Sequence, residues 1–103
     1  MERPKTPRIP IPRERLAEVC RRHHILRLSL FGSVLREDFG PTSDVDLLVE
    51  FDPAYPVGLK IFDVEADLSR LFDGRRVDIV DPKYLNRHLK DRILHDAVLQ
   101  YAA

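Results

Sequence analysis

A Gly-Ser pair, separated by ten residues from two aspartates, restricts what this chain can do more than any other feature. The stretch reads LFGSVLREDFGPTSDVDLLVEF and covers residues 30–51. Asp44 and Asp46 open an otherwise apolar segment, although carboxylates are poor strand formers. Residues two apart on a strand point to the same face, about 6.6 Å apart along the backbone. Two such charges repel unless a cation lies between them, so the stretch predicts a cation site.

A third acidic residue, Asp78, lies in the later segment RRVDIVD with an apolar residue on each side of it. If its strand is a neighbour of the strand that carries Asp44 and Asp46, three carboxylates meet on one face of a sheet. Carboxylate oxygens on rigid strands suit Mg²⁺, and pairs of such ions serve phosphoryl transfer. We therefore expect Asp44, Asp46 and Asp78 to be metal ligands.

The Gly-Ser corner offers groups that bind phosphate. Gly32 lets the backbone approach a ligand closely. Ser33 offers a hydroxyl and an N–H group at the start of a helical turn, and Arg36 can carry a positive charge for a triphosphate. Ser43 precedes the aspartates and is expected to cap the turn beside Asp44. Gly32, Ser33, Arg36 and Ser43 are thus the candidate nucleotide-binding residues.

Helical and strand patterns alternate along the rest of the chain. They predict helices at 12–24 and 59–74, strands at 25–31, 44–51 and 75–81, and a short helical turn within 33–37. A last helix is predicted over 82–102, with Asp91 as the point where it could break. The expected fold is α/β or α+β, with helices that flank a small mixed sheet.

Length and composition limit the class of protein. The 103 residues predict a basic, Pro-rich arm at 1–12 and one domain at 13–103. With one cysteine, Cys20, no internal disulfide can form, and no membrane span or signal peptide is visible, so the cytoplasm is the expected compartment. Cys20 is expected to be a packed structural thiol. The four histidines are expected to have no metal role, because they lack the spacing of ligands.

The charge is distributed unevenly although the net charge is zero. Residues 1–27 carry eight Lys or Arg against three acids, and residues 37–73 carry ten acids against two bases. The acidic middle suits a divalent cation or a basic protein partner. No basic motif interleaved with aromatic residues is present, so we expect no direct contact with nucleic acid.

The central stretch resembles the signature of the nucleotidyltransferase superfamily with the DNA polymerase β-like fold. It is most similar to the minimal nucleotidyltransferases, which are small single-domain proteins. The resemblance covers roughly residues 13 to 101. The matching positions are Gly32, Ser33, Arg36, Ser43, Asp44, Asp46, Leu47, Leu48 and Val49, with Asp78 as the third acid.

This resemblance implies an antitoxin enzyme. Proteins of this kind are usually encoded beside a small helical HEPN protein, a ribonuclease-like toxin. The resemblance implies transfer of AMP from ATP to a tyrosine of that toxin (adenylylation), with two Mg²⁺ ions as cofactors. Asp44 and Asp46 would hold the ions, Asp78 would help to deprotonate the tyrosine, and Gly32, Ser33 and Arg36 would position the triphosphate.

Three other interpretations of the sequence stay open. The enzyme could transfer a nucleotide to a small molecule such as an aminoglycoside. The chain could be an antitoxin that neutralises a toxin by binding alone. Taken singly, each motif could also be structural, with Asp78 in a surface salt bridge to Arg75 or Arg76.

Overall fold

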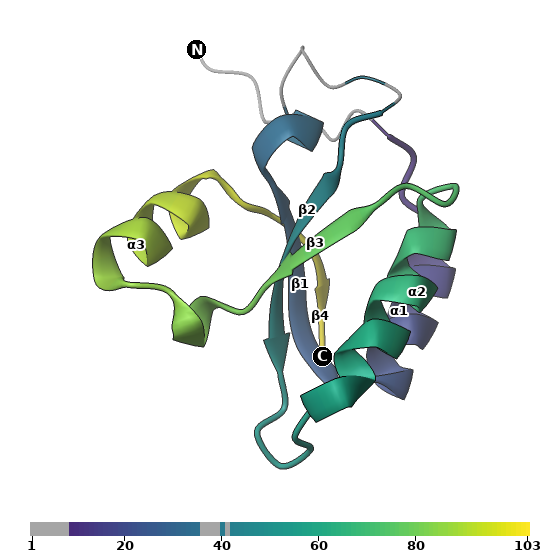
Figure 1. The fold of residues 1–103 in the computed structure, drawn as a ribbon, viewed down its shortest axis with the longest axis horizontal. Coiled ribbons are helices and arrows are strands. Elements are labelled where there is room, and N and C mark those ends of the chain that lie inside the picture. The colour runs from purple at the N-terminus through teal and green to yellow at the C-terminus, as the bar shows by residue number, and fades with distance from the viewer. Residues whose placement is uncertain (1–8, 36–39, 41) are drawn as a thin grey trace.

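Four strands form one mixed sheet with helices on both sides of it (Figure 1). The computed structural model describes residues 9–35, 40 and 42–103, with the backbone alone at residue 33. Strands and α-helices follow in the order α1 (Arg13–Arg22), β1 (Ile25–Phe31), β2 (Val45–Phe51), α2 (Ile61–Leu71), β3 (Val77–Val80), α3 (Arg87–Asp96) and β4 (Val98–Ala102). Short 3-10 helices lie at Gly32–Leu35, Gly58–Lys60 and Pro82–Tyr84.

The strands lie in the order β3-β2-β1-β4. Strand β1 is antiparallel to both β2 and β4, whereas β2 and β3 are parallel. Parallel neighbours need a crossover connection, and α2 supplies it. The expected class, a small mixed sheet flanked by helices, is confirmed.

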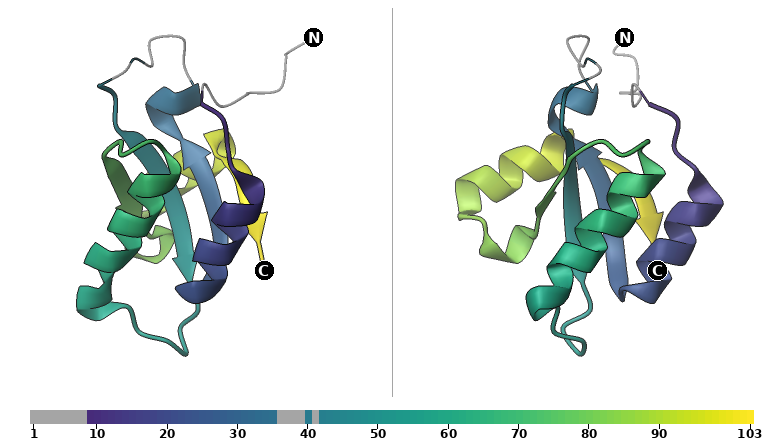
Figure 2. Two further views of the ribbon diagram at one scale, coloured as in Figure 1. Left: turned by 90° about the vertical axis from the view of Figure 1, so that its right-hand side faces the viewer. Right: turned by 45° about the vertical axis from the view of Figure 1, so that its right-hand side comes forward.

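The hydrophobic core lies between one face of the sheet and the pair α1 and α2, which lie side by side (Figure 2). Alternation along β2 turns Val45, Leu47 and Val49 into this core, where all three are fully buried. The two helices contribute the buried side chains Leu16, Val19, Cys20, Val64, Leu68 and Leu71. Burial raises the pKa of the Cys20 thiol to about 12, so Cys20 is the packed, unreactive thiol that was predicted.

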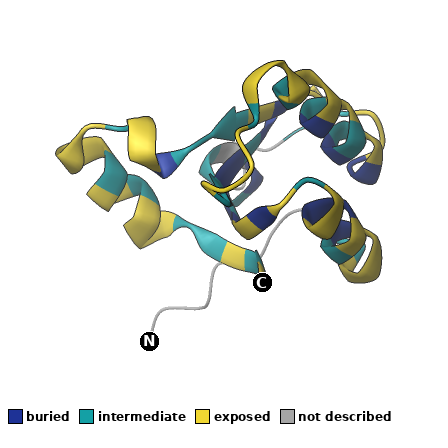
Figure 3. Ribbon diagram, turned by 90° about the horizontal axis from the view of Figure 1, so that it is seen from below, coloured by how far each residue is buried: buried dark blue, intermediate teal, exposed yellow. Residues whose placement is uncertain are grey.

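Helix α3 lies on the other side of the sheet and outside the core (Figure 1). None of its residues is buried, and Figure 3 shows it in the colours of exposed and intermediate residues alone. Leu89 and Leu94 of α3 are 42% and 45% exposed. Among the described residues, no helix is both long enough and apolar enough to cross a membrane.

The C-terminal segment differs from its prediction. The helix expected over 82–102 ends at Asp96, and residues 98–102 form strand β4. Pairing with the free edge of β1 provides backbone partners that a longer exposed helix would lack, so tertiary structure overrides the helical pattern. The break expected at Asp91 is also wrong. Asn86 begins α3 by accepting a hydrogen bond from the Leu89 N–H, so the interruption lies before Asn86.

Candidate active site

Asp46 and Asp78 are directly opposite each other on the parallel strands β2 and β3. The residues that flank Asp46, Val45 and Leu47, turn into the core, so Asp46 and Asp78 point to the opposite face of the sheet. Adjacent strands are about 4.8 Å apart, so the two acids are close neighbours. The expectation that the strands of these acids are neighbours is confirmed.

Asp44 precedes the first residue of β2 and is exposed, whereas Asp46 is half-buried and Asp78 is exposed. In the part of the chain that the structure describes, no three side chains of His, Cys, Asp or Glu form a group that could hold a metal ion. The backbone thus brings Asp46 and Asp78 together on one face, and the described side chains of Asp44, Asp46 and Asp78 do not yet form a three-carboxylate group. The donor set itself, carboxylate oxygens on neighbouring strands, fits Mg²⁺.

Gly32 lies against Asp46 at the end of β1. Its φ angle is +74°, which glycine adopts readily and other residues do not. A Cβ atom at this position would collide with Oδ2 of Asp46. Residue 32 therefore has to be glycine both for its backbone conformation and for the space that the Asp46 carboxylate occupies.

The structure describes the other predicted nucleotide-binding residues to different extents. The backbone of Ser33 lies in the 3-10 helix that follows β1, and its side chain is outside the described part. Arg36 also falls outside the described residues. The Oγ of Ser43 accepts a hydrogen bond from the Gly40 N–H at 3.0 Å, and the Ser43 N–H donates to the Gly40 carbonyl. Ser43 caps the turn before Asp44, as predicted.

The sequence suggested Arg75 only as an alternative salt-bridge partner of Asp78, whereas the structure shows Arg75 in contact with this turn. Its Nη1 donates to the carbonyl of Gly40 at 2.8 Å and to the carbonyl of Ser43 at 3.3 Å. No pattern in the sequence indicates such a contact, because the donor and the acceptors lie more than thirty residues apart. Through Arg75, the α2–β3 connection thus contacts the turn that leads into Asp44.

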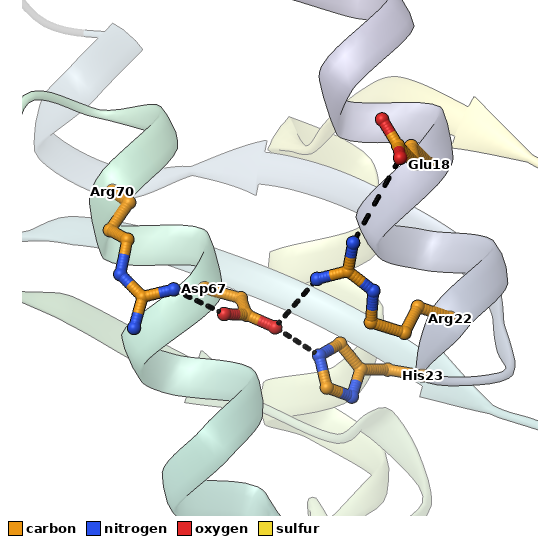
Figure 4. A network of polar contacts seen from close by, with 5 residues as sticks. All are labelled: Glu18, Arg22, His23, Asp67 and Arg70. Carbon is orange, nitrogen blue, oxygen red and sulfur yellow. Dashed lines mark hydrogen bonds and ion pairs between the residues drawn. The ribbon is translucent and has the colours of Figure 1, made fainter.

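A second polar cluster joins α1 to α2, on the side of the sheet that these two helices cover (Figure 4). Asp67 accepts a hydrogen bond from Nε2 of His23 at 2.7 Å and one from Arg70 at 2.7 Å, and Arg22 lies at 3.4 Å. The hydrogen bond from His23, followed by the nearby positive charges, holds the pKa of the Asp67 carboxyl below its ordinary value. These contacts stabilise the packing of α1 against α2. They lie on the opposite face of the sheet from Asp46 and Asp78.

A pocket of about 550 Å³ lies beyond the carboxyl ends of β2 and β3. Phe51, Tyr55, Ile79 and Tyr84 are among its lining residues, and none of the predicted site residues is. Asp46 and Asp78 lie near the other ends of these strands. We therefore place the candidate active site at the acids rather than at this pocket.

Comparison with known proteins agrees with the chemistry of the acids. The family described as "nucleotidyltransferase domain" matches residues 13–99. A protein of Methanocaldococcus jannaschii that carries the provisional name protein adenylyltransferase is 33% identical over 84% of this chain and 90% of its own length. The protein adenylyltransferase MntA of Thermococcus cleftensis is 33% identical over 79% of this chain and 80% of its own.

Solved structures share the fold. A provisionally assigned minimal nucleotidyltransferase superposes with a TM-score of 0.70 and 36% identity, over 84% of this chain and 86% of that one. A chain from a toxin–antitoxin crystal structure with AMP-PNP superposes with a TM-score of 0.64 over 89% of this chain and 74% of that one, at 17% identity, a likeness of fold alone. The paired acids, the glycine beside them and the match over residues 13–99 lead to one assignment: the chain is an enzyme that belongs to the nucleotidyltransferase domain family.

Proposed function

We propose that this chain is a Mg²⁺-dependent protein adenylyltransferase that acts as an antitoxin. It would transfer AMP from ATP to a tyrosine of a small helical HEPN ribonuclease toxin. The observation that carries the proposal is the register of β2 and β3, which sets Asp46 directly opposite Asp78. Two relatives with this enzyme name, each 33% identical, support the reaction, and the likeness to a chain from a toxin–antitoxin complex supports the partner.

The acids provide the electrostatics of the reaction. Asp44, Asp46 and Asp78 would hold two Mg²⁺ ions. When bound, magnesium neutralises the negative charge of a triphosphate and of the leaving pyrophosphate. Gly32 leaves room for the Asp46 carboxylate, and with Ser33 and Arg36 it would position the β- and γ-phosphates.

The chemical step is a displacement at phosphorus. The tyrosine oxygen attacks the α-phosphorus and forms a new P–O bond, while the bond to the β-phosphate oxygen breaks and pyrophosphate leaves. The hydroxyl proton passes to a base, for which Asp78 is the candidate because its exposed carboxylate lies beside Asp46. Most of the catalytic effect would come from placing the two reactants and neutralising charge.

Co-expression tests the proposal directly. The chain is expressed with a small helical HEPN protein, sought first among the products of the neighbouring genes, and the partner's intact mass is measured. We expect a gain of one or more AMP groups on a tyrosine, and no gain with the Asp44→Ala, Asp46→Ala double variant. If that variant neutralises the toxin at equal dose, the antitoxin acts by binding alone. Label from ATP that appears on a small molecule and on no protein would favour a small-molecule acceptor.

A further inference from the structure

Arg75 lies in the connection between α2 and β3 and contacts the turn that precedes β2. Its guanidinium donates through Nη1 to two backbone carbonyls, those of Gly40 and Ser43, at 2.8 and 3.3 Å. The residue is half-buried. Hydrogen bonds from a charged donor are stronger than neutral ones, and one group that holds two carbonyls keeps Gly40 and Ser43 in a fixed relation.

The backbone of Arg75 is itself fixed to the end of α2. Its carbonyl accepts a hydrogen bond from Ser69 Oγ at 2.6 Å, and its N–H donates to the Phe72 carbonyl at 3.1 Å. Asp73 and Gly74 both have positive φ, and the Gly74 N–H donates to the Ser69 carbonyl. This tight connection gives the Arg75 side chain a rigid base from which it reaches the turn.

The same connection holds Asp44 on both sides. The residue before Asp44 accepts the hydrogen bond from Arg75, and the residue after it, Val45, donates its N–H to the Arg76 carbonyl at 2.9 Å. Two residues beyond Arg76 the chain reaches Asp78. One short segment therefore fixes the backbone at Asp44 and also begins the strand that carries Asp78.

We propose that Arg75 is a positioning residue of the active site. It fixes the backbone at Gly40 and Ser43, and thereby the place of Asp44 relative to Asp78 when metal and nucleotide bind. The inference rests on the proposed function, because it takes Asp44 and Asp78 as ligands of one metal site. Groups that hold metal ligands in position commonly change metal affinity by about ten- to a hundredfold when they are removed.

The test is a titration of the full chain with MgCl₂ at a fixed concentration of a non-hydrolysable ATP analogue, with binding followed by calorimetry. In Arg75→Ala we expect the Mg²⁺ concentration at half-saturation to rise about tenfold. Arg75→Lys keeps a charged donor without the planar guanidinium, so its midpoint should lie between those of the wild type and the alanine variant. Arg76→Ala is the matched control, because it removes the same charge from the adjacent exposed residue and keeps the backbone carbonyl that Val45 uses.

The midpoint, together with the folded fraction, separates positioning from loss of folded protein. Irreversible loss of folded protein lowers the number of binding sites and leaves the Mg²⁺ midpoint unchanged. Reversible unfolding raises the midpoint by the inverse of the folded fraction, so circular dichroism measures that fraction for each variant, and only a larger shift counts as positioning. If Arg75→Ala does not fold, the Arg75→Lys midpoint alone decides, and a wild-type value overturns the inference. A wild-type midpoint in Arg75→Ala, or an equal shift in Arg76→Ala, overturns it as well. If Asp44→Asn keeps the wild-type Mg²⁺ dependence, the proposed metal site itself is wrong, which is a separate result.

Discussion

The carboxylate of Asp46 occupies the space in which a side chain of residue 32 would have to lie. The two residues meet because Phe31, the last residue of β1, pairs with Asp46 of β2, and the chain turns at Gly32 immediately afterwards. The contact ties the Gly-Ser corner to the acidic pair, although ten residues separate these two motifs in the sequence.

Gly32→Ala should abolish nucleotide binding and lower the free energy of unfolding by more than the backbone penalty alone. A non-glycine residue at positive φ costs about 1–2 kcal/mol, and the new methyl group must also displace Asp46. Urea denaturation and analogue binding measure the two effects. Gly58→Ala is the matched control, since Gly58 has φ +52° and its added Cβ would meet nothing within 4 Å. Equal losses in both variants would contradict a specific role for the contact with Asp46.

Asp46→Asn and Asp78→Asn should each remove the stabilisation that ATP and Mg²⁺ give to the folded chain. For the wild type, ligand at a hundred times its Kd should raise the free energy of unfolding by about 2.7 kcal/mol. Thermal unfolding with and without both ligands measures this. Asp63→Asn, which removes an exposed acid of α2, should keep the full effect. A wild-type ligand response in both site variants would contradict the assignment of these acids.

Asp67→Asn should destabilise the domain by about 1–3 kcal/mol at neutral pH, because it weakens the hydrogen bonds from His23 and Arg70. The pKa of Asp67 is lowered in the folded state, so its contribution is complete above the ordinary value of 3.8 and is lost as the pH falls through the lowered pKa. The difference in unfolding free energy between wild type and variant should therefore shrink as the pH falls below 3.8. Urea denaturation between about pH 5 and about pH 3 measures it, and a difference that does not shrink over this range would contradict the assignment.

Asn86→Ala should loosen α3 and leave the core intact. The Asn86 side chain accepts the Leu89 N–H at the start of α3, and loss of such a cap costs about 1 kcal/mol of helix stability. Because no residue of α3 is buried, the loss should appear as faster amide hydrogen exchange in 87–96 and not in α1 or α2. Asn86→Asp keeps an acceptor and is the control. Uniformly faster exchange across the domain would mean that α3 supports the core.

Local sequence patterns were sufficient to predict the structure wherever a residue's environment depends on its immediate neighbours in sequence. The strand pattern in 44–51 predicted β2, and the helical pattern in 59–74 predicted α2. The acids of the candidate site were found in the same way, from their positions on two strands.

Long-range contacts explain what the sequence did not reveal. Residues 98–102 carry no signal of their own that distinguishes a strand from the end of a helix, and the free edge of β1 decides the outcome. The contact of Arg75 with Gly40 and Ser43 depends on where the α2–β3 connection lies in three dimensions. Neither fact can be read from periodicity or composition.

Strand β3 is short, lies at the rim of the sheet and carries Asp78, with β2 as its one neighbour. Backbone pairing on a single side makes such a strand the first part of a sheet to fray. With Asp78 in the proposed role of a metal ligand, an opening of these four residues would remove that ligand before the rest of the domain unfolds. The free edge of β3 is therefore the part of the sheet whose stability matters most for keeping Asp78 beside Asp46.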